Sequence, residues 1–326
     1  MIAVEHLTKR YGTFTAVDDI SFTLEEGHIY GFLGPNGAGK STTMNIMTGC
    51  LAATGGSVTI DGLDIFEQAK EAKKLLGYLP EIPPLYPEQT PEEYLRFVAE
   101  AKGTPKGEIE AQVAQAMAET RLEPMANRLI RHLSKGYRQR VGIAQALLGD
   151  PRYIILDEPT VGLDPLQIIE IRDLIHELGQ KHTVILSSHI LSEVQAICES
   201  VLIIAHGKLV AFDTPQNLEQ RLADGGRLTL TADCTPEKLQ QVLQTVPAVT
   251  GCEVLSQEES RCKARLEVAG DAAEACKALF FAFAGAQTAI LQLTPEKADL
   301  ENIFIELTDS EAQQPDGKEP EDESDL

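Results

Sequence analysis

Several absences narrow the classes of protein to which this 326-residue sequence can belong. No apolar run approaches the roughly 18 residues that a membrane-spanning helix needs. The nearest run, 278–291, is short and is interrupted by Gly285, Gln287 and Thr288. Residues 1–9 lack the basic start, apolar centre and small-residue cleavage site of a signal peptide. We therefore expect a globular protein that is made and kept in the cytosol.

Basic residues and paired cysteines are also scarce. The sequence has 28 Lys and Arg against 50 Asp and Glu, which gives a formal net charge of -22. Because nucleic acids attract basic surfaces, this balance argues against nucleic acid as a main partner. The six cysteines form no C-x-x-C pair and no Cys/His cluster with zinc spacing. We expect free thiols in a reducing compartment.

Part of the acidic excess lies at the end of the chain. Residues 309–326 contain many carboxylates, Lys318 as the single basic residue, and no aromatic or β-branched side chain. A segment of this composition cannot bury enough apolar surface to offset the entropy lost on folding. We predict a disordered acidic tail and interpret it as a solubilising segment, with an interaction tail as the alternative.

Residues 1–215 show the pattern of an α/β domain. Short runs rich in Ile, Val and Leu, at 153–156, 183–186 and 201–204, alternate with segments of helical periodicity. Such runs are apolar on both faces of a strand. They predict a buried, mainly parallel sheet with helices on both of its faces.

A helical insertion is predicted within this domain, at about 85–135. Thr90 and Glu93 form a capping-box pattern that opens a helix. We expect the apolar side of this helix to consist of Leu95, Phe97 and Val98. A second helix is expected from about 107 to 120.

The pattern changes after residue 225. Apolar and polar residues alternate, as in half-buried strands, at 228–232, 262–268 and 289–293. Helix starts follow Thr235 and Asp271, and a last helix is indicated by Leu300, Ile303, Phe304 and Leu307. We interpret 226–308 as a small α+β domain of the βαββαβ type. It shows no constellation of catalytic residues, so packing, dimerisation, ligand sensing and partner docking all remain open.

The clearest chemical signal is a glycine-rich run that fits the pattern G-x-x-x-x-G-K-[ST]. The run consists of Gly34, Pro35, Asn36, Gly37, Ala38, Gly39, Lys40, Ser41 and Thr42. Its glycines let the backbone aim N–H groups at a polyphosphate, Lys40 supplies a cation for the β- and γ-phosphates, and Ser41 can hold Mg²⁺. An apolar strand before it, at 28–33, and a helix after it favour a nucleotide site over a chance glycine-rich turn.

Two carboxylates follow a second apolar strand. Asp157 and Glu158 come directly after 153–156. In a nucleotide site, Asp157 can orient Mg²⁺ through its water shell, and Glu158 can polarise the water that attacks the γ-phosphate. Two carboxylates after a strand can also open an ordinary loop, but the phosphate-binding run favours the catalytic interpretation.

The order of these motifs resembles that of a known family. The run Leu-Ser-Lys-Gly-Tyr-Arg-Gln-Arg lies at 133–140, and Leu-Asp-Glu-Pro-Thr lies at 156–160. With the phosphate loop and a downstream histidine, His189, they resemble the ATP-binding cassette (ABC) ATPases of membrane transporters over residues 1 to about 215. The resemblance implies a P-loop NTPase fold with a RecA-like core and a helical subdomain, and ATP and Mg²⁺ as cofactors.

Further site residues are implied by this resemblance alone. Tyr11 corresponds to the aromatic residue that stacks on adenine, and Ser134 and Gly136 correspond to the signature residues that contact phosphate. Asp164, within Gly-Leu-Asp-Pro, corresponds to the key residue of the loop that links two active sites. His189 corresponds to the switch histidine that contacts the γ-phosphate, although a lone histidine is more often structural.

Two positions depart from the family pattern. The usual signature is Leu-Ser-Gly-Gly-Gln, and here Lys135 and Tyr137 replace a glycine and the glutamine. Lys135 either favours the γ-phosphate or is solvated. Glu81 stands where the loop after the middle strand normally carries a glutamine that touches Mg²⁺ and the attacking water. A carboxylate can fill both roles, so we assign Glu81 to the metal and to catalysis.

A narrower resemblance concerns the class of transporter. The runs 77–81, 133–140 and 299–308 resemble the ATPase subunits of type-2 ABC exporters, most of all the gliding-motility-associated and drug- or polysaccharide-export branch. This implies a separately encoded transmembrane permease at whose cytoplasmic side the chain is held. It also implies a head-to-tail dimer, with two ATP molecules between the phosphate loop of one copy and the Ser134, Lys135 and Gly136 of the other.

Two other functions remain as alternatives. A soluble ABC ATPase acting on nucleic acid or ribosomes usually has two cassettes and basic surfaces, whereas this chain has one cassette and an acidic balance. A nucleotide-regulated binding module would hydrolyse little ATP, and the presence of Glu158 and His189 argues against it. We therefore predict an ATP-hydrolysing subunit of a membrane exporter, without a nucleic-acid partner.

Overall fold

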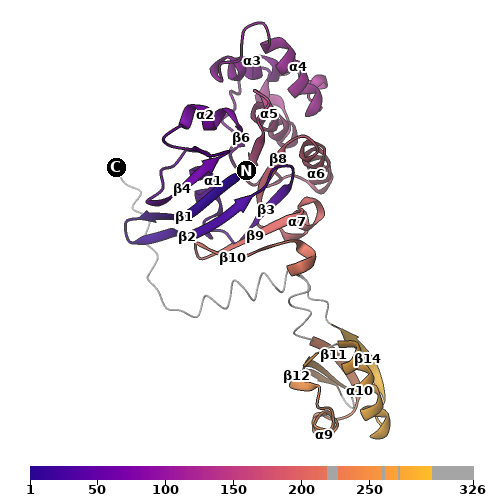
Figure 1. Cartoon of the computed structure of the whole chain (residues 1–326). Helices are drawn as coiled ribbons and strands as arrows, with labels where there is room; N and C mark the ends of the chain where they lie inside the picture. The colour runs from indigo at the N-terminus through magenta and orange to yellow at the C-terminus, as the bar shows by residue number, and fades with distance from the viewer. Residues whose placement is uncertain (219–226, 259–260, 271, 296–326) are drawn as a thin grey trace. The chain divides into compact units, whose positions relative to one another are not determined.

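The computed structural model describes residues 1–218, 227–258, 261–270 and 272–295 (Figure 1). The chain divides into two compact units between Thr214 and Pro215, and each unit is described by itself. The acidic tail predicted at 309–326 and the helix predicted at 300–307 lie outside the described residues.

A six-stranded sheet forms the centre of the first unit, with the order β10-β9-β3-β8-β7-β6. Its strands are β3 (Ile29–Leu33), β6 (Leu76–Leu79), β7 (Tyr153–Leu156), β8 (Thr183–Ser188), β9 (Ser200–Ala205) and β10 (Lys208–Asp213). All neighbours are parallel except β9 and β10. Strands β3, β7 and β8 are buried along their whole length. The predicted buried, mainly parallel sheet is therefore confirmed.

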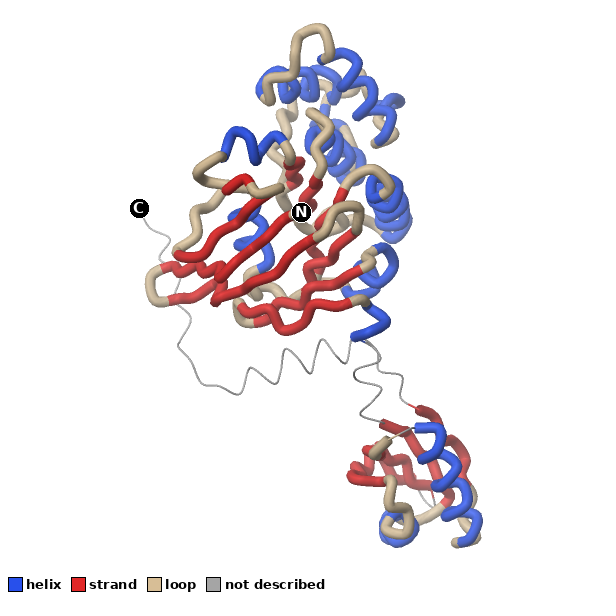
Figure 2. Tube along the Cα trace, viewed as in Figure 1, coloured by secondary structure: helices blue, strands red, loops and turns tan. Residues whose placement is uncertain are grey.

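One face of this sheet is covered differently from the prediction. Instead of a full layer of helices, it faces a four-stranded antiparallel sheet, and helix α1 (Lys40–Met47) shares the same buried cluster (Figure 2). The antiparallel strands are β1 (Ile2–Tyr11), β2 (Phe14–Leu24), β4 (Gly55–Ile60) and β5 (Leu63–Asp64). Phe22 of β2 meets Phe32 of β3 edge to face, with ring centroids 5.5 Å apart. Buried and exposed side chains alternate along β2, so the strand has one apolar face. This pattern is typical of an antiparallel sheet with one face exposed to solvent.

Helices cover the opposite face, as predicted. They are α5 (Lys135–Leu147), α6 (Pro165–Gly179) and α7 (Leu191–Ile197) (Figure 1). Gly31 of β3 lets α7 approach closely, because a Cβ atom there would collide with Val194. The short helix α2 (Ala69–Lys74) precedes β6.

The predicted helical insertion is present between β6 and α5. It contains α3 (Pro91–Ala101), α4 (Ile109–Glu119) and the 3₁₀ turns Glu123–Met125 and Ile130–His132. Thr90 and Glu93 form the predicted capping box on α3. The prediction for Phe97 was wrong: its side chain is 44% exposed and packs against Tyr86 with ring centroids 5.4 Å apart, while Tyr94 and Leu95 form the buried side.

The second unit is a four-stranded antiparallel sheet covered by two helices on one face. Its elements follow the βαββαβ order: β11 (Arg227–Asp233), α9 (Pro236–Leu243), β12 (Val249–Glu258), β13 (Arg261–Val268), α10 (Ala272–Gly285) and β14 (Ile290–Pro295). The strand order is β12-β13-β11-β14. Alternation along β11 and β13 directs Leu230 and Leu266 to the helices, where they join Leu279 and Phe283 in one buried cluster.

The described residues contain neither a membrane-spanning helix nor a disulfide bond. No helix among the described residues is long and apolar enough to cross a membrane. The six cysteines are free. Burial raises the pKa of the Cys198 thiol, so this cysteine is held in its unreactive neutral form.

Candidate functional site

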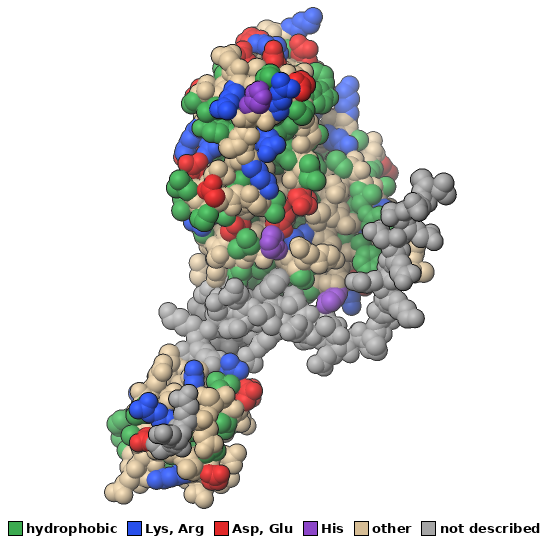
Figure 3. Space-filling view, turned by 180° about the vertical axis from the view of Figure 1, so that it is seen from behind, with side chains coloured by type: hydrophobic (Ala, Val, Ile, Leu, Met, Phe, Trp, Pro, Cys, Tyr) green, Lys and Arg blue, Asp and Glu red, His purple; other side chains and the backbone are tan. Residues whose placement is uncertain are grey.

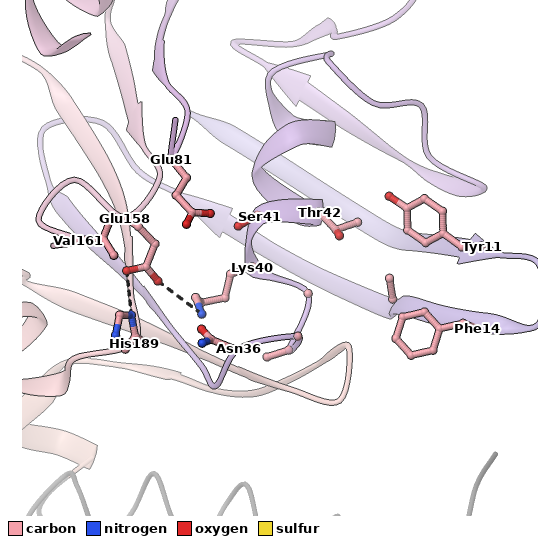
Figure 4. A pocket seen from close by; sticks show the side chains of 14 residues that line it. Tyr11, Phe14, Asn36, Lys40, Ser41, Thr42, Glu81, Glu158, Val161 and His189 are labelled. Carbon is pink, nitrogen blue, oxygen red and sulfur yellow. Dashed lines mark hydrogen bonds and ion pairs between the residues drawn. The ribbon is translucent and has the colours of Figure 1, made fainter. Parts of the chain in front are cut away.

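A pocket in the first unit collects residues from five segments (Figure 4). Its lining residues are Tyr11, Phe14, Ala16, Asn36, Gly37, Ala38, Gly39, Lys40, Ser41, Thr42, Glu81, Glu158, Val161 and His189. Apart from the β1–β2 hairpin, each segment follows the carboxyl end of a parallel strand: β3, β6, β7 or β8. Ligands of open α/β sheets bind at such an edge.

The phosphate loop requires glycine at two positions. Gly39 has φ +105°, and a Cβ atom there would lie 2.5 Å from the carbonyl oxygen of Ala16. Gly37 has φ +81°. Gly39 also caps α1 without a side-chain hydrogen bond, and the first turn of α1 has no acidic residue. The N–H groups at the start of α1 are therefore open to an anion.

Lys40 is folded back into this loop. Its side chain is 6% exposed, and its Nζ donates to the carbonyl oxygens of Gly34 at 2.8 Å and Pro35 at 3.2 Å. Burial lowers the pKa of Lys40, and the carboxylates of Glu158, Asp157 and Glu81 oppose that shift. A cation surrounded by carbonyls and carboxylates is placed to compensate the charge of a phosphate.

Asp157 and Ser41 meet at the edge of the pocket. Asp157 is 2% exposed, and its Oδ1 accepts hydrogen bonds from Ser41 Oγ at 3.2 Å and from Ser187 Oγ at 2.6 Å. The N–H of Asp157 donates to Leu79 O at 2.8 Å, which fixes it against the neighbouring strand. Ser187 was not predicted from the sequence. The feature that could have identified Ser187 as a site residue is its position at the end of β8, the strand next to β7.

Glu158 occupies the centre of the site. Its backbone has φ +47°, in the left-handed region that costs a non-glycine residue about 1–2 kcal/mol. Its N–H donates to Ser187 Oγ at 2.8 Å. One carboxylate oxygen lies 3.7 Å from Lys40 Nζ, and the other lies 3.0 Å from Nδ1 of His189. The two predicted catalytic residues Glu158 and His189 are thus in direct contact.

Glu81 lies in the same pocket. Figure 4 shows its carboxylate directed to the space between Ser41 and Glu158. The sequence has a carboxylate here where the family pattern has an amide, and the structure brings that carboxylate to the side of the pocket where Ser41 lies.

An aromatic pair lines the other end of the pocket. Tyr11 and Phe14 face each other across the β1–β2 hairpin and are about half exposed, at 49% and 51%. The amine of Lys9 lies 5.1 Å from the centre of the Tyr11 ring. Tyr11 was predicted and Phe14 was not. Its signal was an aromatic residue three positions after Tyr11 in an otherwise polar turn.

The four remaining predicted residues do not line this pocket. Ser134 caps α5 and accepts a weak hydrogen bond from the N–H of Tyr137 at 3.4 Å. Asp164 caps α6 and accepts from the N–H of Gln167 at 2.9 Å. The two caps are neighbours, because a Cβ atom on Gly136 would lie 3.0 Å from the side chain of Gln167. They form a second surface that the pocket of the same chain does not use.

The side chain of Lys135 belongs to that second surface. Its amine lies against Gly162, in the turn that leads to Asp164, and a Cβ atom on Gly162 would collide with it. Gly162 has φ +67°, so this position favours glycine for its backbone as well. Lys135 therefore connects the start of α5 with the turn before α6.

A strand, a phosphate loop and a helix, with an acidic pair after a second parallel strand of the same sheet, β7, define a P-loop nucleotide hydrolase. Comparisons give the family: residues 17–161 match the family "ABC transporter". The chain is similar to the linearmycin resistance ATP-binding protein LnrL of Bacillus subtilis, with 32% identity over 310 residues, 94% of this chain and 98% of that protein. It is also similar to the bacitracin transport ATP-binding protein BcrA of Bacillus licheniformis, with 40% identity over 64% of this chain and 68% of that protein. The chain belongs to the ABC transporter family.

Solved structures agree with this assignment. The ATP-binding subunit of an ABC transporter has a TM-score of 0.62 and 32% identity, over 68% of this chain and 93% of that chain. A dimeric bacterial ABC transporter cassette has a TM-score of 0.60 and 27% identity, over 66% of this chain and 98% of that chain. The sequence prediction of an ABC ATPase fold is confirmed.

Proposed function

We propose that this chain is the ATP-hydrolysing subunit of an ABC exporter, working as a dimer with a separate transmembrane permease. The observation that carries the proposal is the convergence of Lys40, Glu158, His189 and Glu81 on one glycine-rich loop. Two similar proteins carry "resistance" and "transport" in their names, which supports a role in export, in line with the type-2 exporter class. The transported compound is a property of the permease.

ATP would lie along the pocket from the aromatic pair to the carboxylates. The base stacks on Tyr11 and Phe14, whose exposed rings offer an apolar platform. The N–H groups at the start of α1 hold the phosphates. Lys40 leaves the carbonyls of Gly34 and Pro35 and binds the β- and γ-phosphates.

The residues around Ser41 fit a magnesium ion. Ser41, Asp157 and Glu81 supply hard oxygen donors on one side of the phosphate loop, and Mg²⁺ prefers such ligands together with water and phosphate oxygens. The ion, when bound, neutralises charge on the β- and γ-phosphates.

Glu158 is the general base of the proposed hydrolysis. A water molecule between Glu158 and the γ-phosphate gives its proton to the carboxylate, its oxygen attacks phosphorus, and ADP leaves with the electrons of the broken bond. His189, held by Glu158 at 3.0 Å, contacts the γ-phosphate and keeps the carboxylate aligned.

A second copy of the chain would complete the site. Ser134, Lys135, Gly136 and Asp164 do not line the pocket of their own chain, and they lie together on another surface. In a head-to-tail dimer, that surface of one copy faces the ATP of the other. ATP then bridges the two copies, and hydrolysis releases the bridge, which makes closure a nucleotide-dependent two-state element.

Two features of the surface support a permease, rather than nucleic acid, as the partner. Tyr86 and Phe97 form an exposed aromatic cluster beside the segment that follows Glu81. This suits contact with a permease at the cytoplasmic face of the membrane. On the face seen in Figure 3, basic side chains are interspersed with acidic ones, whereas nucleic-acid binding favours a continuous basic patch.

Lys40→Ala tests the proposal at its first step. We expect the variant to lose tight ATP binding, because the phosphates lose the buried cation of the loop. Fluorescence titration with an ATP analogue measures the affinity, and release of inorganic phosphate measures turnover. Lys70→Ala, on the exposed side of α2, is the matched control and should behave as the wild type. Unchanged affinity of Lys40→Ala would show that this loop is not the nucleotide site.

A further inference from the structure

Glu193 is a buried carboxylate that does not line the nucleotide pocket. It lies in the first turn of α7 and is 5% exposed. Its Oε2 accepts a hydrogen bond from Thr160 Oγ1 at 2.5 Å and from Ser188 Oγ at 3.2 Å. The three residues come from three segments: the loop after β7, the end of β8, and α7.

Burying a carboxylate at this position costs free energy. Both of its described partners are neutral hydroxyl groups, and no ion pair to Glu193 is present within the described residues. Removing a carboxylate from water without a cation costs several kcal/mol before hydrogen bonds are counted. An apolar residue would fill the space beneath α7 at lower cost, so stability alone does not account for Glu193.

The partners of Glu193 flank the two residues assigned to catalysis. Thr160 stands two positions after Glu158, and Ser188 stands directly before His189. Ser188 Oγ also accepts from the N–H of Ile190 at 3.0 Å, so the backbone on both sides of His189 is tied to one hydroxyl. Glu193 therefore joins, through one carboxylate, the backbone segments that carry Glu158 and His189.

The two neighbouring serines at the end of β8 bind different partners. Ser187 Oγ bonds Asp157 and the N–H of Glu158, while Ser188 Oγ points to Glu193. The alternation of side chains along a strand separates these two contacts onto opposite faces. Ser187 thus holds Glu158, whose φ is +47°, and Glu193 holds Thr160 two positions further along the same loop.

We propose that Glu193 is a positioning residue that sets the alignment of Glu158 with His189, so that it governs the rate of hydrolysis and leaves nucleotide affinity unchanged. The proposal rests on the roles given to Glu158 and His189 in the proposed function. It extends the site to a buried layer behind the pocket, in which Thr160, Ser188 and Glu193 act as one unit.

Glu193→Ala in the full-length chain is the first test. We expect kcat to fall between tenfold and about 10²-fold, the usual effect of displacing a reacting group by about 1 Å. ATP affinity, measured by titration, should stay within about threefold of the wild type, because no phosphate or base contact is removed. Ser192→Ala, an exposed change in the same helical turn, is the control and should leave both quantities unchanged.

Two substitutions at Thr160 test the same layer without touching α7. Thr160→Val removes the hydroxyl and should lower kcat as Glu193→Ala does, whereas Thr160→Ser keeps the hydroxyl and should restore most of the rate. The double variant Glu193→Ala with Thr160→Val should be no slower than the slower single variant. The reason is that both substitutions break the same contact, the hydrogen bond between Thr160 and Glu193. If Glu193→Ala fails to fold, the comparison of Val with Ser at position 160 decides: equal rates would overturn the proposal.

A Glu158→Gln background separates this proposal from the proposed function. In that background Glu193→Ala should slow the residual hydrolysis by less than about twofold, since Glu193 acts through Glu158. A wild-type kcat for Glu193→Ala, with Glu158→Gln inactive, would overturn the role of Glu193 alone. A fully active Glu158→Gln would instead remove the proposed base, and the role of Glu193 with it.

Discussion

The two units of the chain are held by the same kind of apolar core but differ in what else they bury. The first unit encloses Lys40, Asp157, Glu158 and Glu193, all below 9% exposure. In the second unit, the polar side chain buried among the described residues is Thr288, a neutral group whose hydroxyl bonds the carbonyl of Ala286. Burying a charge is costly, so a chain keeps buried charges where chemistry uses them.

This difference shows how the interior of each unit can be tested. A change in the charged interior of the first unit should alter the rate of hydrolysis and spare the fold. A change in the apolar interior of the second unit should alter stability and spare the rate.

Glu158→Gln should have the largest effect on the first unit. We expect hydrolysis to fall by roughly 10²–10⁴, the usual contribution of a general base, because the amide cannot take the proton of water. ATP binding should persist, and an ATP-bound dimer should accumulate on size exclusion with ATP and Mg²⁺. Thermal unfolding should change little, as the two side chains have nearly the same shape. A variant with full activity that stays monomeric with ATP would refute the assignment.

Phe283→Ala should have the largest effect on the second unit. This side chain is fully buried between α10 and the sheet, and truncation leaves a cavity that costs about 3–5 kcal/mol. Denaturant unfolding followed by circular dichroism should show an earlier transition for this unit. The ATPase rate of the folded protein should stay within twofold.

Phe280→Ala is the matched control for that experiment. Phe280 lies on the same helix but is 59% exposed, so its truncation should change stability by no more than about 0.5 kcal/mol. An equal loss of stability from Phe280→Ala would show that this exposed ring is covered in solution. A loss of ATPase activity from Phe283→Ala would show that the two units depend on each other.

Glu81→Gln should have the smallest effect and sharpens the comparison within the pocket itself. The amide keeps an oxygen for Mg²⁺ and water but removes a negative charge beside the phosphates. We expect equal or tighter ATP affinity and a change in hydrolysis of less than about tenfold, which is about 1.4 kcal/mol in barrier. Steady-state ATPase assays and nucleotide titration measure both. A loss as deep as that of Glu158→Gln would make Glu81 the catalytic carboxylate.

Local patterns in the sequence predicted the parallel core and most of the pocket. The phosphate loop, the acidic pair after β7 and the capping box at Thr90 are each defined by a few consecutive residues, and their geometry is fixed by those residues and the element beside them. The βαββαβ order of the second unit followed from alternation of the same local kind.

Features that depend on distant pairing were missed. The antiparallel sheet pairs β1 with β4, for example Ile2 with Ile60, and nothing local in either strand specifies the partner. Phe97 fits the helical apolar pattern but lies beside Tyr86 at the surface, because Tyr94 takes the buried position. The link from Thr160 to Glu193 spans 33 residues and becomes visible only when β7, β8 and α7 are assembled.

The separation of Ser134 and Asp164 from the pocket of their own chain has a practical consequence. If each active site is shared between two molecules, the fraction of complete sites depends on how many molecules have met. The turnover per molecule is then a function of dilution as well as of substrate. An assay at low protein concentration would report association together with chemistry, and a permease that holds two copies side by side would raise the rate without altering any residue of the site.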